Sequence, residues 1–600
     1  MKFWKVFLAS LLAIFVSSVI SLLVWIGVIS GAVAWILSSL NKPDFEVTSS
    51  TVLKIDMAEN ISDAPLASPL AGFDIKTMTY TPTLSLLEVL RTIEAAQDDD
   101  RIRGLYLNFS GPGNADMAVL EELRSAIESF KQSGKFVVAY NSAYTQGAYY
   151  VASAADKVYM QPEGELHWSG ISSTQFFLKG TFDKLGVKAE VFRPTSCKYK
   201  SAVEPYFRSS MSEANRLQMK VLGDKMWEVI VGDVARSRNL DPTKLNALAN
   251  HSALHLPAEA LNSGLVDGLI YEDQLDAVFE EYGVSRRGDG LFNIITLGQY
   301  KTLIHPASGS KPKVGVVYAN GEILDGKGED DKVYSEVLAE TLRKAREDGS
   351  IKAVVLRVNS PGGSALASDV IWREVELLKR KKPVVVSMGA YAASGGYYIS
   401  APADVIVADR LTLTGSIGVF GMMLDGSAMF KNKLGITFDG VKTNSSADFG
   451  QGFLGMTVRS ITPREREAMI RSVDKVYDTF TRHVAEGRNL KQQRVLEIAE
   501  GRVWSGTQAV ELGLADANGG LREAVAVAAN KAELGSSYIV VEVLPKLSPL
   551  AELLKVANFS ATSASAEDIS NMLMIEERKK LLHELTRSGV QAYSTHRVTM

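Results

Sequence analysis

The chain has 600 residues, enough for more than one large hydrophobic core, and its formal net charge of −4 is close to neutral. Nucleic-acid-binding surfaces are usually basic, so this balance gives a nucleic-acid role no support. The single cysteine, Cys197, excludes an internal disulfide and has no neighbouring cysteine or histidine that would indicate a metal site.

The N-terminal segment is strongly apolar. After Lys2 and Lys5 no charged residue occurs until Lys42, and this run exceeds the ~20 residues that cross a bilayer. The triplet Ala32-Val33-Ala34 would suit signal-peptide cleavage, but a cleavable signal has an apolar core of only about 7–15 residues, so we favour an uncleaved anchor. Because two lysines precede the span, the positive-inside rule predicts a cytoplasmic N-terminus. Residues 1–45 are therefore expected to be a cytoplasmic stub and one transmembrane helix, with the body outside, in the periplasm of a Gram-negative cell.

Residues 46–304, called the first half below, alternate strand and helix patterns. Runs rich in β-branched residues predict strands at Thr51–Ile55, Ile102–Phe109 and Lys135–Tyr140. Apolar positions at helical spacing predict a helix over Met117–Phe130, between the second and third of these strands. This order is typical of an α/β fold with a mostly parallel sheet.

The same order recurs in residues 305–546, the second half. Ile351–Val358 predicts a strand that ends in Asn-Ser-Pro-Gly-Gly, and Pro383–Val386 predicts the next one. That strand leads to Tyr397-Tyr398, as the first half leads to Tyr149-Tyr150, at a shift of about 249 positions. We infer a tandem duplication of one domain, joined by a Pro/Gly/Ser-rich linker at the start of the second half.

The last segment, residues 547–600, is polar and rich in serine and alanine. An amphipathic stretch over Asn571–Leu585 predicts a short helix there, followed by a loose end.

Ser394 lies where the strand at Pro383–Val386 gives way to a helix, among alanines and glycines. Small neighbours let a peptide carbonyl approach a hydroxyl, and the first helical turn offers free N–H groups. The nearby Ser360-Pro361-Gly362-Gly363 also ends a strand before a helix. The N–H of Gly362 or Gly363, with that of Ser394 or Gly395, would form an oxyanion hole.

The two halves differ where chemistry is expected. Gln146 stands opposite Ser394, so the first half lacks the hydroxyl. Conversely, Lys198 and Lys200 stand opposite Ser446–Phe449, which contains no lysine. One site built from both halves explains this division, with a neutral lysine as the base of the serine. Alternation alone leaves Lys198 and Lys200 both open, and His167 is a weaker rival.

Four motifs resemble the signal peptide peptidase A (protease IV) family in its long, duplicated form. They are KYKSAVEP from Lys198, NSPGG from Asn359, GAYAASGGYY from Gly389 and TGSIGV from Thr414. The resemblance implies two ClpP/crotonase-like domains of repeated ββα units. It also implies that Ser394 is the nucleophile, Lys200 the general base, and Ser416 a residue that orients the lysine.

The resemblance further implies a homotetramer on the periplasmic face of the inner membrane that degrades signal peptides already cut from exported proteins. No metal or organic cofactor is implied. Two alternatives are kept: an acyl-CoA enzyme that uses the oxyanion hole without a nucleophile, and a non-catalytic membrane scaffold.

Overall fold

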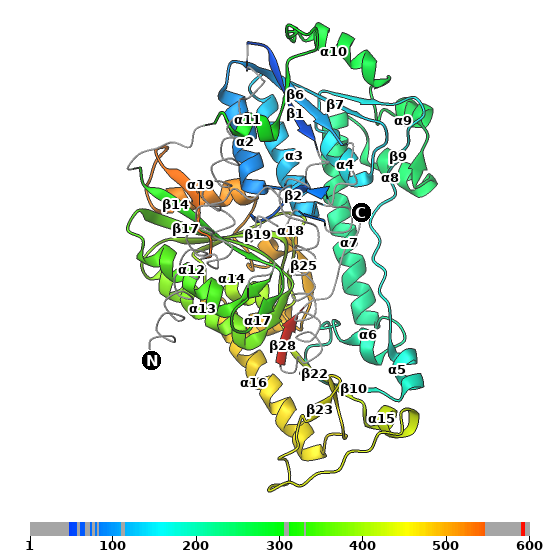
Figure 1. Cartoon of the computed structure of the whole chain (residues 1–600), viewed down its shortest axis with the longest axis vertical. Helices are drawn as coiled ribbons and strands as arrows, with labels where there is room; N and C mark the ends of the chain where they lie inside the picture. The colour runs from blue at the N-terminus through cyan, green and yellow to red at the C-terminus, as the bar shows by residue number, and fades with distance from the viewer. Residues whose placement is uncertain are drawn as a thin grey trace, which may run out of the picture.

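The computed structural model describes residues 47, 49–56, 60–65, 73–74, 79–80, 83–109, 115–304, 311–328, 332–545 and 590–593. Figure 1 shows the first half in blue to green at the top and the second half in green to orange below it. Both halves combine sheets with packed helices, which confirms the predicted α/β class.

The first half is built on a six-stranded sheet of order β12-β8-β7-β6-β1-β13. All its pairings are parallel. Its strands are β1 (Thr51–Asp56), β6 (Ile102–Asn108), β7 (Phe136–Asn141), β8 (Lys157–Met160), β12 (Gly268–Leu269) and β13 (Ile294–Thr296). Its main helices are α2 (Leu86–Asp98), α3 (Met117–Lys131), α4 (Gln146–Ala152), α7 (Glu213–Arg238), α8 (Pro242–His251), α9 (Pro257–Ser263), α10 (Leu275–Glu281) and α11 (Leu297–Lys301).

The second half repeats this plan around a path β25-β21-β19-β17-β14-β27, which is parallel except for the β21–β25 pair. These strands are β14 (Lys313–Asn320), β17 (Ile351–Ser360), β19 (Val384–Ala393), β21 (Leu413–Gly415), β25 (Val503–Ser505) and β27 (Ile539–Glu542), with β20 (Val405–Ala408) and β26 (Ala517–Asn518) beside the path. Its helices are α12 (Ser335–Glu347), α13 (Ala365–Lys379), α14 (Gly395–Ser400), α15 (Ser427–Lys433), α16 (Pro463–Gly487), α17 (Gln492–Ile498), α18 (Gly506–Glu511) and α19 (Leu521–Lys531).

The duplication extends to individual hydrogen bonds. The Tyr149 hydroxyl donates to the Leu265 carbonyl at 2.8 Å, and the Tyr397 hydroxyl donates to the Leu514 carbonyl at 2.8 Å. Both tyrosines are buried on a short helix after a central strand. Each bond satisfies a buried phenol that would otherwise cost about 1–3 kcal/mol.

A third sheet joins the halves. Its path is β16-β15-β18-β28-β22-β24-β23, and β10 of the first half pairs with β22 of the second. The strands are β10 (Lys188–Phe192), β15 (Ile323–Leu324), β16 (Val333–Tyr334), β18 (Gly362–Ser364), β22 (Phe420–Asp425), β23 (Gly452–Phe453), β24 (Met456–Thr457) and β28 (Val590–Tyr593). In Figure 1, the first-half segment with α5 (Lys179–Leu185), β10 and α6 (Glu204–Phe207) lies beside β22 and α15. This crossing carries first-half residues into the second half.

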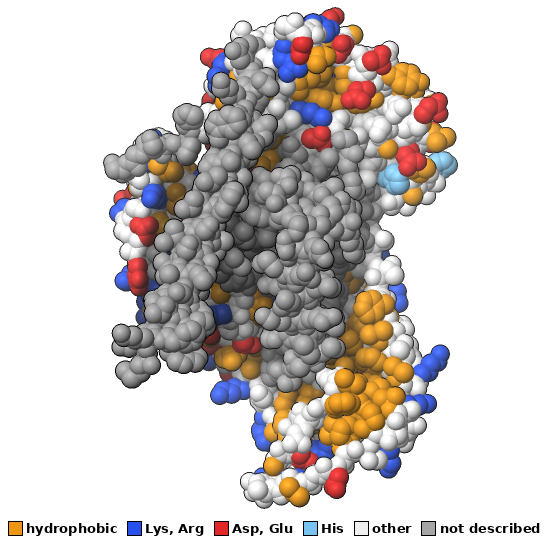
Figure 2. Space-filling model, viewed as in Figure 1, with side chains coloured by type: hydrophobic (Ala, Val, Ile, Leu, Met, Phe, Trp, Pro, Cys, Tyr) orange, Lys and Arg blue, Asp and Glu red, His pale blue; other side chains and the backbone are white. Residues whose placement is uncertain are grey.

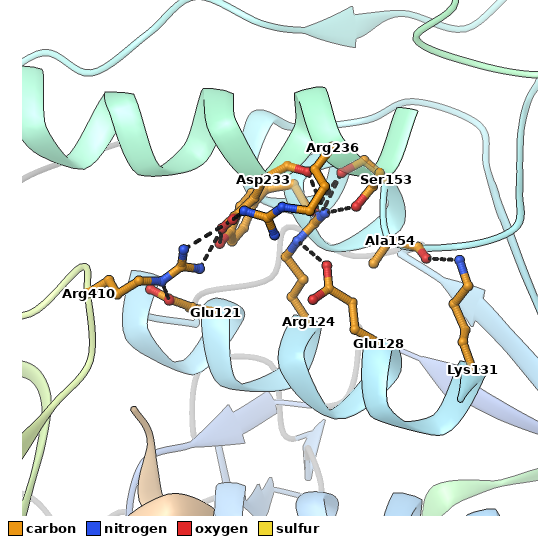
Figure 3. Close-up of polar contacts among 11 residues, drawn as sticks. Glu121, Arg124, Glu128, Lys131, Ser153, Ala154, Asp233, Arg236 and Arg410 are labelled. Atoms are coloured by element: carbon orange, nitrogen blue, oxygen red, sulfur yellow. Dashed lines mark hydrogen bonds and ion pairs between the residues drawn. The ribbon is translucent and has the colours of Figure 1, made fainter. Parts of the chain in front are cut away.

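Ion pairs also connect the halves, partly buried at Arg410 and fully buried at Arg357. Arg410 bonds to Asp233 on α7 at 2.7 Å and to Glu121 on α3, while Arg124 on α3 donates to Ser153 (Figure 3). Close by, Arg357 of β17 pairs with Glu122 of α3 at 2.7 Å and with Asp63. Removing one member of the buried Arg357 set costs roughly 3–5 kcal/mol, so this set holds the two halves in one arrangement.

The predicted core strands and the helix predicted at Met117–Phe130 are confirmed, with ends that agree within one or two residues. Two predictions differ from the structure. The strand predicted to end at Val386 continues to Ala393, because its end pairs with β21. The tail, expected to end loosely, contains strand β28, which has partners on both sides.

Other predicted segments lie outside the described residues: the anchor at 1–45, linker residues 305–310 and the helix at Asn571–Leu585. Among the described helices, none combines the length and apolar character needed to cross a membrane.

Candidate active site

Ser394 sits between the last residue of β19 and the first residue of α14. It is fully buried and has φ 56° and ψ −115°, a backbone conformation that costs a non-glycine residue roughly 1–3 kcal/mol. Its N–H donates to the Gly415 carbonyl at 2.9 Å, and its carbonyl accepts from the Tyr398 N–H at 2.8 Å. These bonds stabilise the sharp turn between β19 and α14 and so fix the position of the Ser394 hydroxyl.

Lys200 belongs to the first half, and its amine lies beside the Ser394 hydroxyl. It follows β10, whose antiparallel pairing with β22 carries the chain across. Its Nζ lies 2.6 Å from Ser394 Oγ, 2.9 Å from the Ser416 carbonyl and 3.0 Å from Ser416 Oγ. The predicted lysine, nucleophile and orienting serine are therefore brought together in one buried cluster.

Burial is the main cause that lowers the pKa of Lys200 to about 7, and the neighbouring Cys197 opposes it. The amine is thus neutral in a large fraction of molecules near neutral pH, as a base requires. Lys198 differs in every respect. Its side chain is 57% exposed, and the Glu500 carboxylate 2.9 Å away raises its pKa. The geometry therefore separates the two lysines that the sequence left open.

Ser416 lies in the turn between β21 and β22, with φ 49°. Its N–H donates to the Arg502 carbonyl at 2.7 Å, so the turn is held by the segment before β25. Its carbonyl and hydroxyl both face the lysine amine. These two oxygens fix the direction of Nζ.

The three predicted oxyanion glycines also meet here. A Cβ on Gly395 would lie 3.1 Å from Gly362 Cα and 3.2 Å from Gly363 N, so only glycine permits this approach. The Gly362 N–H donates to Ser360 Oγ at 3.2 Å, and the Ser394 N–H is bound to Gly415. The Gly395 N–H is the first of α14 and has no acceptor within that helix. The Gly395 N–H is thus placed as a donor, and Gly363, whose N lies 3.2 Å from the position of a Gly395 Cβ, is next to it.

The position between strands β18 and β22, called the slot below, is occupied by a strand. Strand β28 fills it and pairs antiparallel with β18, placing Tyr593 opposite Gly362 and Ala592 opposite Gly363. On its other side it pairs antiparallel with β22. A strand of this chain's own tail therefore lies between β18 and β22, beside Gly362 and Gly363.

Gln146 occupies the position in the first half that corresponds to Ser394, and its side chain is bonded to the backbone. Gln146 is buried, donates to the Gly170 carbonyl at 3.0 Å and accepts from the N–H groups of Ser169 and Gly170. His167 is half-exposed and contacts Glu165 at 3.3 Å. Neither residue takes part in the Ser394 cluster.

Sequence reasoning missed Gln218 of α7, which fastens the lysine loop. Its side-chain NH₂ donates to the Tyr199 carbonyl and to Ser201 Oγ, both at 3.0 Å, and its carbonyl accepts from the Val503 N–H. No local pattern marks this glutamine, because its partners come together only when the halves assemble.

The model of peptidase family S49 matches residues 129–284 and 376–535 of this chain, one stretch in each half. Protease 4 of Haemophilus influenzae is 37% identical over 466 residues, which cover 75% of this chain and 73% of that protein. Protease 4 of Salmonella typhi is 34% identical, with 82% and 80% covered. The chloroplastic serine protease SPPA of Arabidopsis thaliana is 32% identical, with 86% and 74% covered.

Two matched stretches, one per half, agree with the duplication seen in the fold. The relatives align over most of their own length, so the likeness extends beyond a single motif. The chain belongs to peptidase family S49 and is a serine protease.

Proposed function

We propose that this serine protease is a membrane-anchored endopeptidase with a Ser394–Lys200 dyad that degrades cleaved signal peptides at the outer face of the inner membrane. The observation that carries the proposal is the 2.6 Å contact between a buried lysine amine and a buried serine hydroxyl. We also assign to each half the ClpP/crotonase-like fold expected from the family resemblance.

In the proposed reaction, the neutral amine of Lys200 accepts the proton of the Ser394 hydroxyl while Oγ bonds to the substrate carbonyl carbon. The Gly363 and Gly395 N–H groups stabilise the negative oxygen, each donor contributing roughly 3–4 kcal/mol. Lys200 then gives its proton to the leaving amine as the C–N bond breaks. The same lysine then takes a proton from a water whose oxygen bonds to the acyl carbon, and it returns a proton to Ser394 Oγ as the ester bond breaks.

Ser416 has an orienting role in this scheme. A neutral amine has two hydrogens and one lone pair. With the hydrogens directed to the Ser416 carbonyl and hydroxyl, the lone pair faces Ser394 Oγ. The amine is then in the geometry of a base before substrate arrives.

The slot beside β18 supports a peptide substrate bound in extended form. It already holds four residues of this chain, of which Gln591–Tyr593 pair with β18 and Val590–Gln591 pair with β22. Backbone pairing is tolerant of sequence, as degradation of varied signal peptides requires.

The acyl-CoA alternative is not favoured, because it required an oxyanion hole without a nucleophile, and Ser394 is paired with a low-pKa lysine. The scaffold alternative conflicts with membership of a serine protease family.

A homotetramer is part of the proposal. Hydrophobic side chains gather over the lower part of the face in Figure 2, where Figure 1 places α5, α6 and α15. Exposed hydrophobic residues within or close in sequence to α5, α15 and β23 are Phe176, Leu185, Leu434, Phe438 and Phe453. An exposed apolar area of this kind suits contact with further copies of the chain. Light scattering of the detergent-solubilised protein measures the assembly.

The direct test of function is hydrolysis of a synthetic signal peptide by the full-length protein. Ser394→Ala and Lys200→Ala are each expected to lower kcat by at least about 1,000-fold. Gln146→Ala, at the equivalent position of the first half, is the matched control and is expected to retain activity. Full activity in either dyad variant would overturn the proposed mechanism.

A further inference from the structure

The segment Glu500–Arg502, between α17 and β25, lies between the two loops that form the site. The Glu500 carbonyl accepts from the Tyr199 N–H at 3.0 Å on one side. The Arg502 carbonyl accepts from the Ser416 N–H at 2.7 Å, and the Gly501 N–H donates to the Ile417 carbonyl at 2.9 Å on the other. One short segment therefore bonds both to the lysine loop and to the Ser416 loop.

Gly501 is in backbone contact with Lys200. A Cβ on Gly501 would lie 2.5 Å from Lys200 Cβ and 2.8 Å from Lys200 Cα and N. The chain at Gly418 also comes close, since a Cβ on Gly418 would lie 2.8 Å from Gly501 Cα. The chain at Gly501 thus closely approaches two other stretches of backbone, which cannot yield as the end of a flexible side chain would.

Gly501 also needs to be glycine for its conformation, since its φ is +75°. A side chain there would push Lys200 away from the segment by several tenths of an ångström or more. The lysine has little freedom in the opposite direction, because Nζ is already in contact with Ser394 Oγ at 2.6 Å. Displacement would lengthen or misalign this contact, on which proton transfer depends.

We infer that Gly501 is a positioning residue for the general base: its missing side chain sets how far Lys200 projects toward Ser394. Gln218 also helps to position Lys200, because its side chain bonds to Tyr199 and Ser201 on either side of the lysine and to Val503, the residue after this segment. The inference rests on the proposed function, since it assigns Gly501 a role only if Lys200 is the base.

Gly513 provides a matched control. Its φ is also +75°, but a Cβ there would meet only Leu490 Cδ2, at 3.8 Å, an ordinary contact. Gly501→Ala and Gly513→Ala therefore place a Cβ at the same unfavourable φ, and only the first brings it against Lys200. Any difference between them reports the contact with the lysine rather than the loss of a glycine.

The experiment compares both variants in the full-length protein with a synthetic signal peptide. Gly501→Ala is expected to lower kcat at least 30-fold, with KM within twofold, and to move the acidic limb of the pH–rate profile away from its wild-type position. Gly513→Ala is expected to keep both constants within twofold and the limb unmoved. Equal kcat values and superimposable pH profiles in the two variants would overturn the inference.

A second variant covers the case in which Gly501→Ala does not fold. Gln218→Met keeps the side chain's size and removes its hydrogen bonds, and it is expected to move the acidic limb in the same way with a smaller loss of kcat. An unmoved limb there would also count against the inference. Ser394→Ala separates the two claims: if it stays active, the proposed function fails, whereas an inactive Ser394→Ala with unaffected glycine and glutamine variants defeats the positioning role alone.

Discussion

The Nζ of Lys200 lies 2.6 Å from the Oγ of Ser394, although 194 positions separate these residues in the chain. One comes from the first copy of a duplicated domain and the other from the second. The crossing of β10 onto β22 makes the meeting possible. Neither copy holds both groups, so activity is expected to require both.

The first prediction concerns the pH dependence of hydrolysis. Burial lowers the pKa of Lys200 to about 7, and only the neutral amine can accept a proton. The value of kcat/KM is therefore expected to rise about tenfold per pH unit below that pKa and to level off above it. Steady-state kinetics between pH 5 and pH 9 measure this. A profile flat across pH 7 would rule out a base with this pKa.

The second prediction concerns stability. The folded chain has a neutral Lys200 above about pH 7, whereas the unfolded chain keeps this lysine protonated up to about its ordinary pKa of 10.5. Between these values the unfolded state binds one more proton, so stability rises with pH. Relative to Lys200→Met, the wild-type free energy of unfolding should increase by up to about 1.4 kcal/mol per pH unit.

Chemical denaturation of both proteins at pH 7, 8 and 9 checks this slope. Lys198→Met is the control, because Lys198 is exposed and paired with Glu500. A constant difference between wild type and Lys200→Met across the range would contradict the buried, low-pKa lysine.

The third prediction uses the backbone of Ser394. Its φ of 56° strains any residue with a Cβ, by roughly 1–3 kcal/mol, and glycine avoids this strain. Glycine also gives the unfolded chain more freedom, which offsets about 0.5–1 kcal/mol. Ser394→Gly is thus expected to be about 1 kcal/mol more stable than Ser394→Ala. Thermal unfolding compares the two, and an Ala variant as stable as the Gly variant would argue against strain at this turn.

The fourth prediction concerns strand β28, which fills the slot beside β18. A segment of the same chain in this slot competes with an added peptide, so a chain shortened to end just before Val590 is expected to show a lower KM and an unchanged kcat. A peptide containing Val590–Tyr593 should inhibit the shortened protein competitively. The same peptide with Ala592→Pro, which lacks one N–H, should inhibit less. An unchanged KM after truncation would show that the tail does not compete.

Much of the fold could be predicted because local patterns specify it. The strands at Ile102 and Ile351 and the helix at Met117 follow from apolar spacing alone, and the repeat follows from matching motifs. The contrast between Gln146 and Ser394 indicated which half would hold a hydroxyl. The choice of Lys200 over Lys198 came from the family resemblance, since a strand pattern treats both alike.

The remainder depends on contacts that no local pattern encodes. The continuation of β19 to Ala393 requires β21 as a partner, and β28 requires both β18 and β22. The need for glycine at position 501 arises from its contact with the backbone of Lys200, about 300 residues away in sequence. Such pairings are properties of the assembled halves.

The most direct test of the central claim is the rate at which a fluorophosphonate, which reacts with activated serines, labels the full-length protein. The label should map to Ser394 by peptide mass spectrometry, at a rate that rises through about pH 7, and Lys200→Met should slow it at least about 100-fold. Labelling of a different residue, or labelling of Ser394 at the wild-type rate in Lys200→Met, would contradict the dyad.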